Sequence, residues 1–289
     1  MVSTPAALAA KNATKTIPVI MAASADPVGG GVVESLARPG GNVTGLALMN
    51  TDLTSKRVEI LKQAMPSLTW LAAVHRGPSE FPIVAHWLNE NTDAARRFGV
   101  RVLDVPLGVE AAEWERGLLT IPKRPGTAVT ILEDPALVAH SNLVANLLLK
   151  VRLPAVFPFR EHVDGGGMVS YGVNLAQLFR RSARYVDRIL RGAKPADLPI
   201  EQPTKFELAS TSRPPRPSVS RSRRRCSGPG GSGDRVGQLP YLLLWVRVAL
   251  LIRSIRTTTF DQATGPTAKT VLARALTMRS QLTREGWWN

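Results

Sequence analysis

The sequence has little of several residue types on which whole classes of protein depend. It contains one cysteine, Cys226, and four histidines among 289 residues. An internal disulfide framework is therefore excluded, and a Cys/His zinc site at the usual ligand spacing is absent. We predict no metal site and no cofactor.

Long apolar runs are also missing. The longest, residues 239–252, contains Arg247 and falls short of the ~20 residues that a membrane-spanning helix needs. Residues 1–17 have neither the basic start nor the apolar stretch of a secretory signal. We expect no membrane span, and we expect the chain as written to stay cytoplasmic.

Acidic residues are few relative to basic ones, and the imbalance is local. The chain has 37 Lys and Arg against 22 Asp and Glu, a net charge of +15. Residues 1–209 hold 23 basic and 19 acidic side chains, whereas residues 210–289 hold 14 and 3. The tail includes Arg221 and Arg223 to Arg225 among serines and prolines. An arginine-rich arm can neutralise phosphates, so nonspecific polyanion or nucleic-acid binding through this tail is the alternative function.

What is present up to residue 209 is an alternation of apolar runs with amphipathic stretches. We predict strands at residues 17–21, 70–74, 100–105, 127–132, 154–157 and 168–174. We predict helices at residues 30–36, 56–64, 83–98, 111–119, 138–150 and 175–191. Strands separated by helical stretches indicate βαβ units and a parallel sheet covered by helices, so the predicted class is α/β.

In such a sheet, ligands lie beyond the carboxyl ends of the strands. That rule selects the loops at residues 22–31, 75–81, 133–137 and 159–167. In the first loop, Asp26 and Pro27 fit either the first residues of a helix or an anion or zwitterion site at a helix N-terminus. Gly29 to Gly31 lack the Lys-Ser/Thr of a phosphate-binding loop, so no nucleotide site is predicted.

Catalytic motifs are not found. Glu133 and Asp134 are adjacent on a loop, which does not make them face each other, and no G-x-S-x-G motif accompanies His75 or His162. We therefore expect no enzymatic activity and name no catalytic residue.

Two long segments carry a family resemblance. TIPVIMAASADPVGGGVVESLARPGGNVTGL and FREHVDGGGMVSYGVNLAQLFRRSARYVDRILRGAKPADLPIEQPTKFEL, with the order of elements between them, resemble the ABC transporter substrate-binding proteins of the type I periplasmic-binding-protein fold. Some members bind tryptophan, tyrosine or phenylalanine. The resemblance implies a two-lobe α/β fold that traps a small polar or amino-acid-like solute between its lobes. It also implies an ABC permease as partner and a periplasmic or cell-envelope location.

The resemblance also implies domain boundaries and a ligand site. Residues 1–42 would be a partial lobe one, 43–166 lobe two, 167–200 the return to lobe one, 201–209 the final crossing and 210–289 a non-native tail. Phe159 would stack on the ligand, Arg160 would clamp a carboxylate, and loop carboxylates would hold an ammonium. Tyr171 fits the protein core equally well. The predicted ligand residues are Ser24, Asp26, Pro27, Ser79, Glu80, Asp134, Pro135, Phe159, Arg160, Glu161, Tyr171 and Asn174.

Two departures from the family pattern concern the ends. The family usually begins with a signal peptide and further βα units, so we expect an incomplete lobe one with unpaired strand edges, and weak or no solute binding. After Leu208 the family continues INLKTAKALGL, and the codons that follow in this chain can spell that string when displaced by two bases. We predict a frameshift from residue 209 to about 237, followed by translated downstream DNA.

Overall fold

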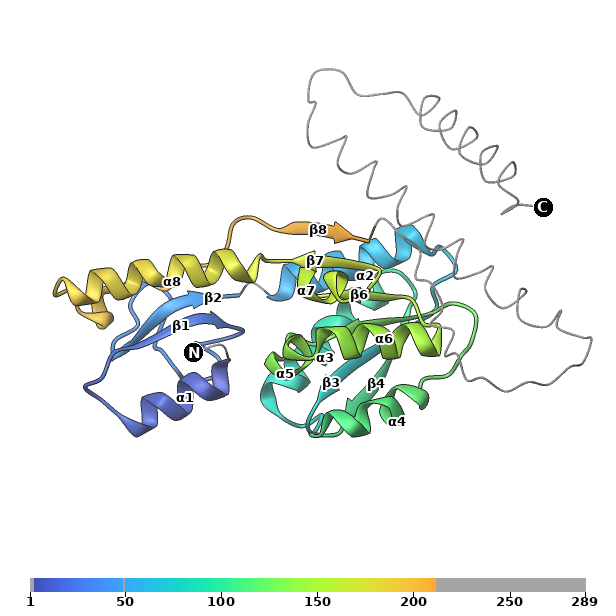
Figure 1. Ribbon diagram of the computed structural model, residues 1–289, viewed down its shortest axis with the longest axis horizontal. Coiled ribbons are helices and arrows are strands. Elements are labelled where there is room, and N and C mark those ends of the chain that lie inside the picture. The colour runs from blue at the N-terminus through green and yellow to red at the C-terminus, as the bar shows by residue number, and fades with distance from the viewer. Residues whose placement is uncertain (1–2, 49, 212–289) are drawn as a thin grey trace, which may run out of the picture. The chain divides into compact units, whose positions relative to one another are not determined.

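The computed structural model describes residues 3–48 and 50–211 (Figure 1). The predictions for residues 212–289, including the arginine-rich arm and the frameshift, lie outside the described residues. The strands are β1 (Val19–Ser24), β2 (Val43–Ala47), β3 (Trp70–Arg76), β4 (Arg101–Leu107), β5 (Thr127–Ile131), β6 (Ala155–Phe157), β7 (Val169–Gly172) and β8 (Glu207–Ser210). The α-helices are α1 (Thr4–Ala13), α2 (Asn50–Ala64), α3 (Pro82–Arg96), α4 (Trp114–Leu119), α5 (Pro135–Ala139), α6 (Ser141–Val151), α7 (Arg160–Asp164) and α8 (Leu175–Leu190). Two 3₁₀ turns, η1 (Ala111–Glu113) and η2 (Pro195–Asp197), complete the described elements.

The larger sheet has six strands in the order β4-β3-β5-β6-β7-β8. The first five run parallel, and β8 pairs antiparallel with β7. Every residue of β5 is buried, because the sheet is covered by helices on both faces. The predicted α/β class and the mainly parallel sheet are confirmed.

Alternation along β3 places its residues in two separate cores. Ala72 and Val74 pack in the cluster that includes Trp114 of α4 and Leu148 of α6, whereas Ala73 packs in the cluster with Trp87 of α3. Successive side chains of a strand point to opposite faces, so one short apolar run supplies both layers. The strand predictions agree with the structure to within a few residues for this reason.

A second sheet consists of β1 and β2, paired in parallel. Met21 of β1, Ala7 of α1 and Ile200 pack with Val32 and Val33 in its core. α8 contacts both of its strands and α1 contacts β1 (Figure 1).

The predicted helix at residues 30–36 is wrong, because this segment consists of turns and bends. Gly31 has φ of +68°, in the left-handed region, which interrupts a right-handed helix. A Cβ at Gly30 would lie 2.3 Å from Cγ2 of Thr4, so the loop is packed closely against α1. Asp26 therefore does not begin a helix.

Other helix predictions require smaller corrections. The helix predicted at residues 138–150 is two helices, α5 and α6, which meet at His140. The segment predicted as a loop at residues 159–167 contains α7, which begins after the extended Phe159 and ends at Gly165. Among the helices of the described residues, none combines the length and apolarity needed to cross a bilayer.

Candidate functional site

The carboxyl ends of β3, β5 and β6 lie at one edge of the larger sheet, because these strands are parallel and adjacent. The loops that follow contain Ser79 and Glu80 after β3, Asp134 and Pro135 after β5, and Arg160 in the first turn of α7. Glu80, Pro135 and Arg160 are exposed. The structure thus places these three loops at one edge of the larger sheet, and their role in binding a ligand stays a prediction.

A buried ion pair lies at this edge, and its arginine was missed by the sequence reasoning. Arg57 of α2 pairs with Glu133, and each side chain is only 2% exposed. The Arg57 Nε also donates to the backbone oxygen of Tyr171 at 2.8 Å. Arg57 thus connects α2 to the ends of both β5 and β7.

The sequence did contain a signal for this arginine. Arg57 is four residues from both Leu53 and Leu61, which are buried, so it lies on the apolar face of its helix. An arginine at that position needs a buried partner, because an unpaired buried charge is very costly. Space for it comes partly from Gly172, where a Cβ would lie 3.3 Å from an Arg57 Nη and 1.9 Å from the oxygen of Pro158.

Asp134, predicted as a ligand residue, makes several contacts within the protein. Its Oδ1 accepts from the backbone N–H groups of Ala136 and Leu137 at 2.8 and 3.1 Å, which caps α5. Its two oxygens also accept hydrogen bonds from the Arg76 guanidinium. The distances are 2.9 Å from Nε to Oδ1 and 3.3 Å from Nη2 to Oδ2. These bonds hold the loop after β5 against the end of β3.

Ser79 is also held by a neighbouring strand. Its hydroxyl donates to Asp104 Oδ2 at 2.6 Å, and Asp104 Oδ1 lies 2.6 Å from His75 Nε2. The serine and the histidine contact different oxygens of one carboxylate and not each other. This arrangement fixes the β3 loop to β4 and does not form a nucleophile with an adjacent base.

His162 lies in an apolar setting. Its ring stacks on Phe157 with centroids 5.0 Å apart, and burial lowers the pKa of the imidazole to about 4 despite the nearby carbonyls of Phe159 and Leu137. The charge of Arg57 lowers the pKa further. The ring is therefore neutral near pH 7.

Four side chains near this edge have buried polar atoms without a hydrogen-bond partner among the described residues. The atoms are Nδ1 of His75, Oε2 of Glu133 and of Glu161, and both ring nitrogens of His162. Buried polar atoms in native proteins are usually satisfied by protein, water or ligand. A polar molecule bound at this edge would therefore gain the most binding free energy from hydrogen bonds to these atoms.

The remaining predicted residues near the larger sheet have structural contacts. Phe159 packs in a core cluster, and exposed Arg160 pairs with Asp164 at 3.5 Å. The Tyr171 ring packs on Phe206, with centroids 6.2 Å apart. Asn174 caps α8 by accepting from Gln177 N at 2.9 Å, and its Nδ2 donates to Glu207 at 2.9 Å.

The loop after β1 is built mainly from turns. The hydroxyls of Ser24 and Thr4 lie 2.9 Å apart, and Asp26 N donates to Thr4 Oγ1 at 3.2 Å. Asp26 Oδ1 accepts from Gly29 N at 2.8 Å, while the Pro27 oxygen accepts from two later backbone N–H groups. Asp26 therefore stabilises a turn, and the helix N-terminus expected beside it is not there.

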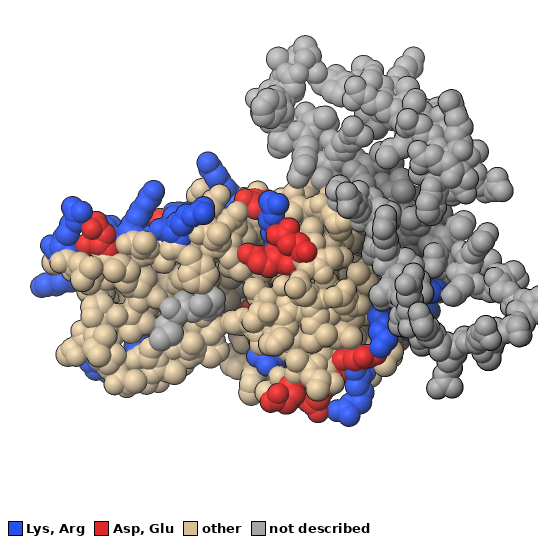
Figure 2. All heavy atoms as spheres, viewed as in Figure 1, with Lys and Arg blue, Asp and Glu red and all other residues tan. Residues whose placement is uncertain are grey.

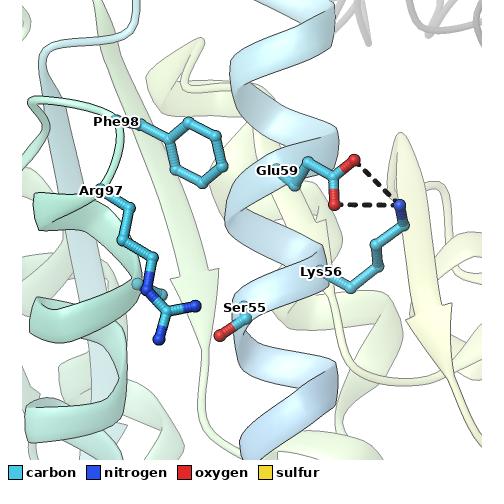
Figure 3. Close-up of a pocket in the computed structure, with 6 residues that line it drawn as sticks. Ser55, Lys56, Glu59, Arg97 and Phe98 are labelled. Atoms are coloured by element: carbon cyan, nitrogen blue, oxygen red, sulfur yellow. Dashed lines mark hydrogen bonds and ion pairs between the residues drawn. The ribbon is translucent and has the colours of Figure 1, made fainter.

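A shallow pocket of about 190 Å³ lies elsewhere, between α2 and the end of α3 (Figure 3). None of the predicted ligand residues lines it, and Lys56 at its rim pairs with Glu59 at 2.9 Å. The described residues contain no group of three or more His, Cys, Asp or Glu side chains that could hold a metal ion.

Residues 1–209 match the family model described as ABC transporter substrate binding protein. The chain belongs to this family. Its members are substrate-binding proteins, which are not enzymes, and this agrees with the expectation that the chain catalyses no reaction.

Individual relatives extend the comparison. A tyrosine-binding protein from Clostridioides difficile (strain R20291) is 24% identical over 200 residues, which cover 69% of this chain and 56% of that protein. The chain thus spans little more than half the length of this curated relative. A crystal structure of the ABC domain from Streptococcus pneumoniae in complex with L-Trp is 26% identical, with a TM-score of 0.64, and the match covers 72% of this chain and 70% of that one.

A conserved domain protein from Vibrio cholerae has a TM-score of 0.65 and 25% identity, over 72% of this chain and 69% of its own. These likenesses confirm the expected periplasmic-binding-protein-like fold of the family. The assignment of individual ligand residues stays a prediction.

Proposed function

We propose that this chain is the solute-binding component of an ABC-type import system and reversibly binds a small amino-acid-like solute. The observation that carries the proposal is the match of residues 1–209 to the substrate-binding family. Two relatives that bind tyrosine or L-Trp by their names favour an aromatic amino acid over other solutes. The partners would be the solute and an ABC permease, and the protein would act in the cell envelope.

The proposed ligand site is the cleft between two lobes, with the carboxyl edge of the larger sheet as one wall and the loop after β1 as the other. The chain would cross between the lobes three times: near residue 48, at residues 173–174 and between residues 201 and 206. Each of these segments links elements of the two sheets. Short crossings of this kind are typical of hinge closure around a ligand.

The chemistry of the carboxyl edge suits a zwitterion. Glu161 has a buried Oε2 without a partner among the described residues, and exposed Glu80 lies in the loop after β3. A carboxylate that pairs with a desolvated ammonium makes a strong charge-assisted bond. Arg160 is exposed, and its guanidinium could leave Asp164 and pair with a ligand carboxylate. Phe159 and Tyr171 would then lie near the aromatic ring of the ligand.

The test is calorimetric titration with L-Tyr, L-Trp, L-Phe and L-Leu, together with thermal unfolding. An aromatic amino acid at 100 times its dissociation constant should stabilise the protein by about 2.7 kcal/mol. Tryptamine and indole-3-propionate, which each lack one charge of the zwitterion, should bind more weakly. Heat from none of the four amino acids would contradict the proposal.

A single substitution tests the role of the buried carboxylate. Glu161→Gln keeps the size of the side chain and removes its charge, and it should weaken amino-acid binding about tenfold or more. Glu110→Gln, at an exposed position in another loop, is the matched control and should leave the affinity unchanged. Equal affinity in Glu161→Gln would remove this residue from the site and leave the solute-binding function itself intact.

A further inference from the structure

Arg57 differs in its setting from the other basic residues that the structure describes. The basic side chains visible in Figure 2, including those gathered over α8, project from the surface. Among the described residues, Arg57 is the one lysine or arginine that is buried, and its charge is paired with Glu133. A buried guanidinium loses its hydration, which is costly unless groups of the protein replace it. The groups that Arg57 contacts should therefore explain why it is buried.

The first contact of Arg57 is at the end of β7. Its Nε donates to the backbone oxygen of Tyr171 at 2.8 Å. The pairing of β7 with β6 ends at Ser170, so Tyr171 and Gly172 extend beyond that neighbouring strand. A Cβ on Gly172 would lie 3.3 Å from Nη2 of Arg57, so the guanidinium is also close to this backbone. Arg57 thus holds the last two residues of β7.

The chain leaves the larger sheet directly after this point. Residues 173–174 are one of the three segments that link elements of the two sheets. A second such segment, residues 201–206, is held nearby, because the ring of Phe206 packs on the ring of Tyr171. α2, the helix that carries Arg57, itself begins just after the remaining segment. Arg57 is therefore placed to control how the chain crosses from one sheet to the other.

The second contact of Arg57 is at the carboxyl edge of the larger sheet. Glu133, its ion-pair partner, follows β5 and directly precedes Asp134, which caps α5 and binds Arg76. The proposed solute-binding loop after β5 thus begins at the carboxylate that Arg57 holds. One guanidinium joins this loop to the backbone at the start of a crossing.

Stability alone does not account for the buried pair. Replacing a buried ion pair by apolar side chains of similar size is often neutral or stabilising. The pair also leaves Oε2 of Glu133 buried without a partner among the described residues, so the carboxylate is only partly satisfied. What arginine provides is a rigid planar fork that donates to two groups at once in fixed directions. That property suits a residue that fixes geometry.

We propose that Arg57 is a positioning residue for the solute site, because by holding Tyr171 and Glu133 together it couples solute binding at the carboxyl edge to closure of the two lobes. This inference rests on the proposed solute-binding function. With its bond to Tyr171, the end of β7 has one position relative to the solute-binding loop, and the lobes rotate about a fixed pivot. Without that bond, the pivot has several positions, and only a fraction of the molecules can close correctly. The apparent affinity for the solute falls by that fraction.

The decisive variant is Arg57→Lys. Lysine keeps a positive charge opposite Glu133, but its single ammonium lacks the fork that reaches Glu133 and Tyr171 together. Arg57→Met with Glu133→Leu is the second variant, which buries no charge and also lacks the bond to Tyr171. Arg116→Lys, in an exposed pair with Glu113, is the matched control.

The position of the lobes is measured directly with two spin labels in the full chain. Leu119→Cys on α4 and Arg188→Cys on α8 are exposed sites, one near each sheet, and Cys226→Ser removes the single native thiol. Pulsed electron spin resonance then gives the distribution of distances between the labels. This measurement needs no solute, so its result is independent of whether the proposed function is correct.

We expect a broader distance distribution in Arg57→Lys and in the double variant than in the otherwise unchanged protein. Arg57→Lys should also weaken the binding of L-Trp and L-Tyr in calorimetric titrations about tenfold or more. Arg116→Lys should change neither the distribution nor the affinity. A residue that only stabilised the fold would leave both unchanged in a variant that is still folded.

Two results would overturn the proposal while leaving the solute-binding function intact. The first is a distance distribution that is as narrow in both Arg57 variants as in the unchanged protein. The second is equal affinity of Arg57→Lys and the unchanged protein for the same amino acid. Heat from none of the amino acids with the unchanged protein would instead contradict the proposed function, and the coupling to solute would fail with it.

Discussion

The two sheets of this chain bury their apolar side chains in different ways. In the larger sheet, β3 and β5 are buried on both faces, and their side chains enter separate clusters with α4 and α6 on one side and α3 on the other. The β1–β2 sheet has two strands and a smaller core, which includes Val32 and Val33 from a loop of turns. A two-stranded unit is marginal by itself, so this region depends on helices and loops from elsewhere in the chain.

The difference extends to polar groups. The larger region buries an ion pair and two histidines, His75 and His162, at the carboxyl edge of its sheet. Near β1, polar contacts are mainly hydrogen bonds between hydroxyls, turn backbone and Asp26. The larger region should therefore contain both the greater part of the stability and the strongest electrostatic couplings.

The largest effect is expected for Arg57→Met. It leaves Glu133 as an unpaired buried charge and should lower the free energy of unfolding by about 3–5 kcal/mol in urea titrations. Arg57→Met combined with Glu133→Leu should recover most of that loss. Lys150→Met breaks a solvent-exposed pair with Glu115 and should cost less than about 1 kcal/mol. Equal losses for Arg57→Met and Lys150→Met would contradict the difference between buried and exposed pairs.

Two matched core truncations compare the regions directly. Leu148→Ala in the larger core should cost about 2–5 kcal/mol and reduce hydrogen-exchange protection throughout the described residues. Met21→Ala in the smaller core should reduce protection mainly in β1 and β2. The measurement is native-state hydrogen exchange. Loss of protection in β3 and β5 equal to that in β1 after Met21→Ala would show that the two regions unfold as one.

Lowering the pH should destabilise the larger region, because this region contains all four histidines. Burial lowers the pKa of His162 from 6.5 to about 4, so the unfolded state binds a proton more readily than the folded state. Stability should fall as the pH drops from 6.5 toward 4, with a total contribution of roughly 3 kcal/mol from this group. His162→Leu should reduce that slope in urea titrations at several pH values. His86→Gln, at an exposed position, should keep it, and an unchanged slope in His162→Leu would refute the assignment.

The smallest effect is expected at the junction between β7 and α8. Asn174→Ala removes the cap of α8 and should lower the free energy of unfolding by about 1 kcal/mol. Asn174→Ser restores a capping oxygen and should recover most of the loss, although it cannot bond Glu207. Thermal unfolding of both variants provides the measurement. A serine variant as unstable as the alanine variant would place the effect in the Glu207 bond and not in the cap.

Much of the larger sheet could be predicted because its signals are local. The run at residues 127–132 is apolar and β-branched, and it forms the fully buried strand β5. Residues 30–36 were wrongly predicted as a helix, because turn residues and the close contact of Gly30 with Thr4 outweigh the apolar residues in that segment. Local composition decides an element only where no distant contact competes with it.

The candidate site was predictable in outline but not in its contacts. The topological rule selected four polar loops; three lie at the carboxyl edge of the larger sheet, whereas the loop at residues 22–31 follows β1 of the two-stranded sheet. It could not show that Asp134 caps α5 and binds Arg76, or that Arg57 lies beside Glu133, 76 residues away in the chain. Such pairings depend on which helix covers which strand.

By itself, the sequence determined the α/β class, most strands and helices of the larger sheet, and the family to which residues 1–209 belong. These follow from periodicity and motif order, which are properties of neighbouring residues. Only the tertiary structure decided which polar side chains are used to hold the fold and which buried atoms lack partners. Those features arise when residues far apart in the chain compete for the same space and the same hydrogen bonds.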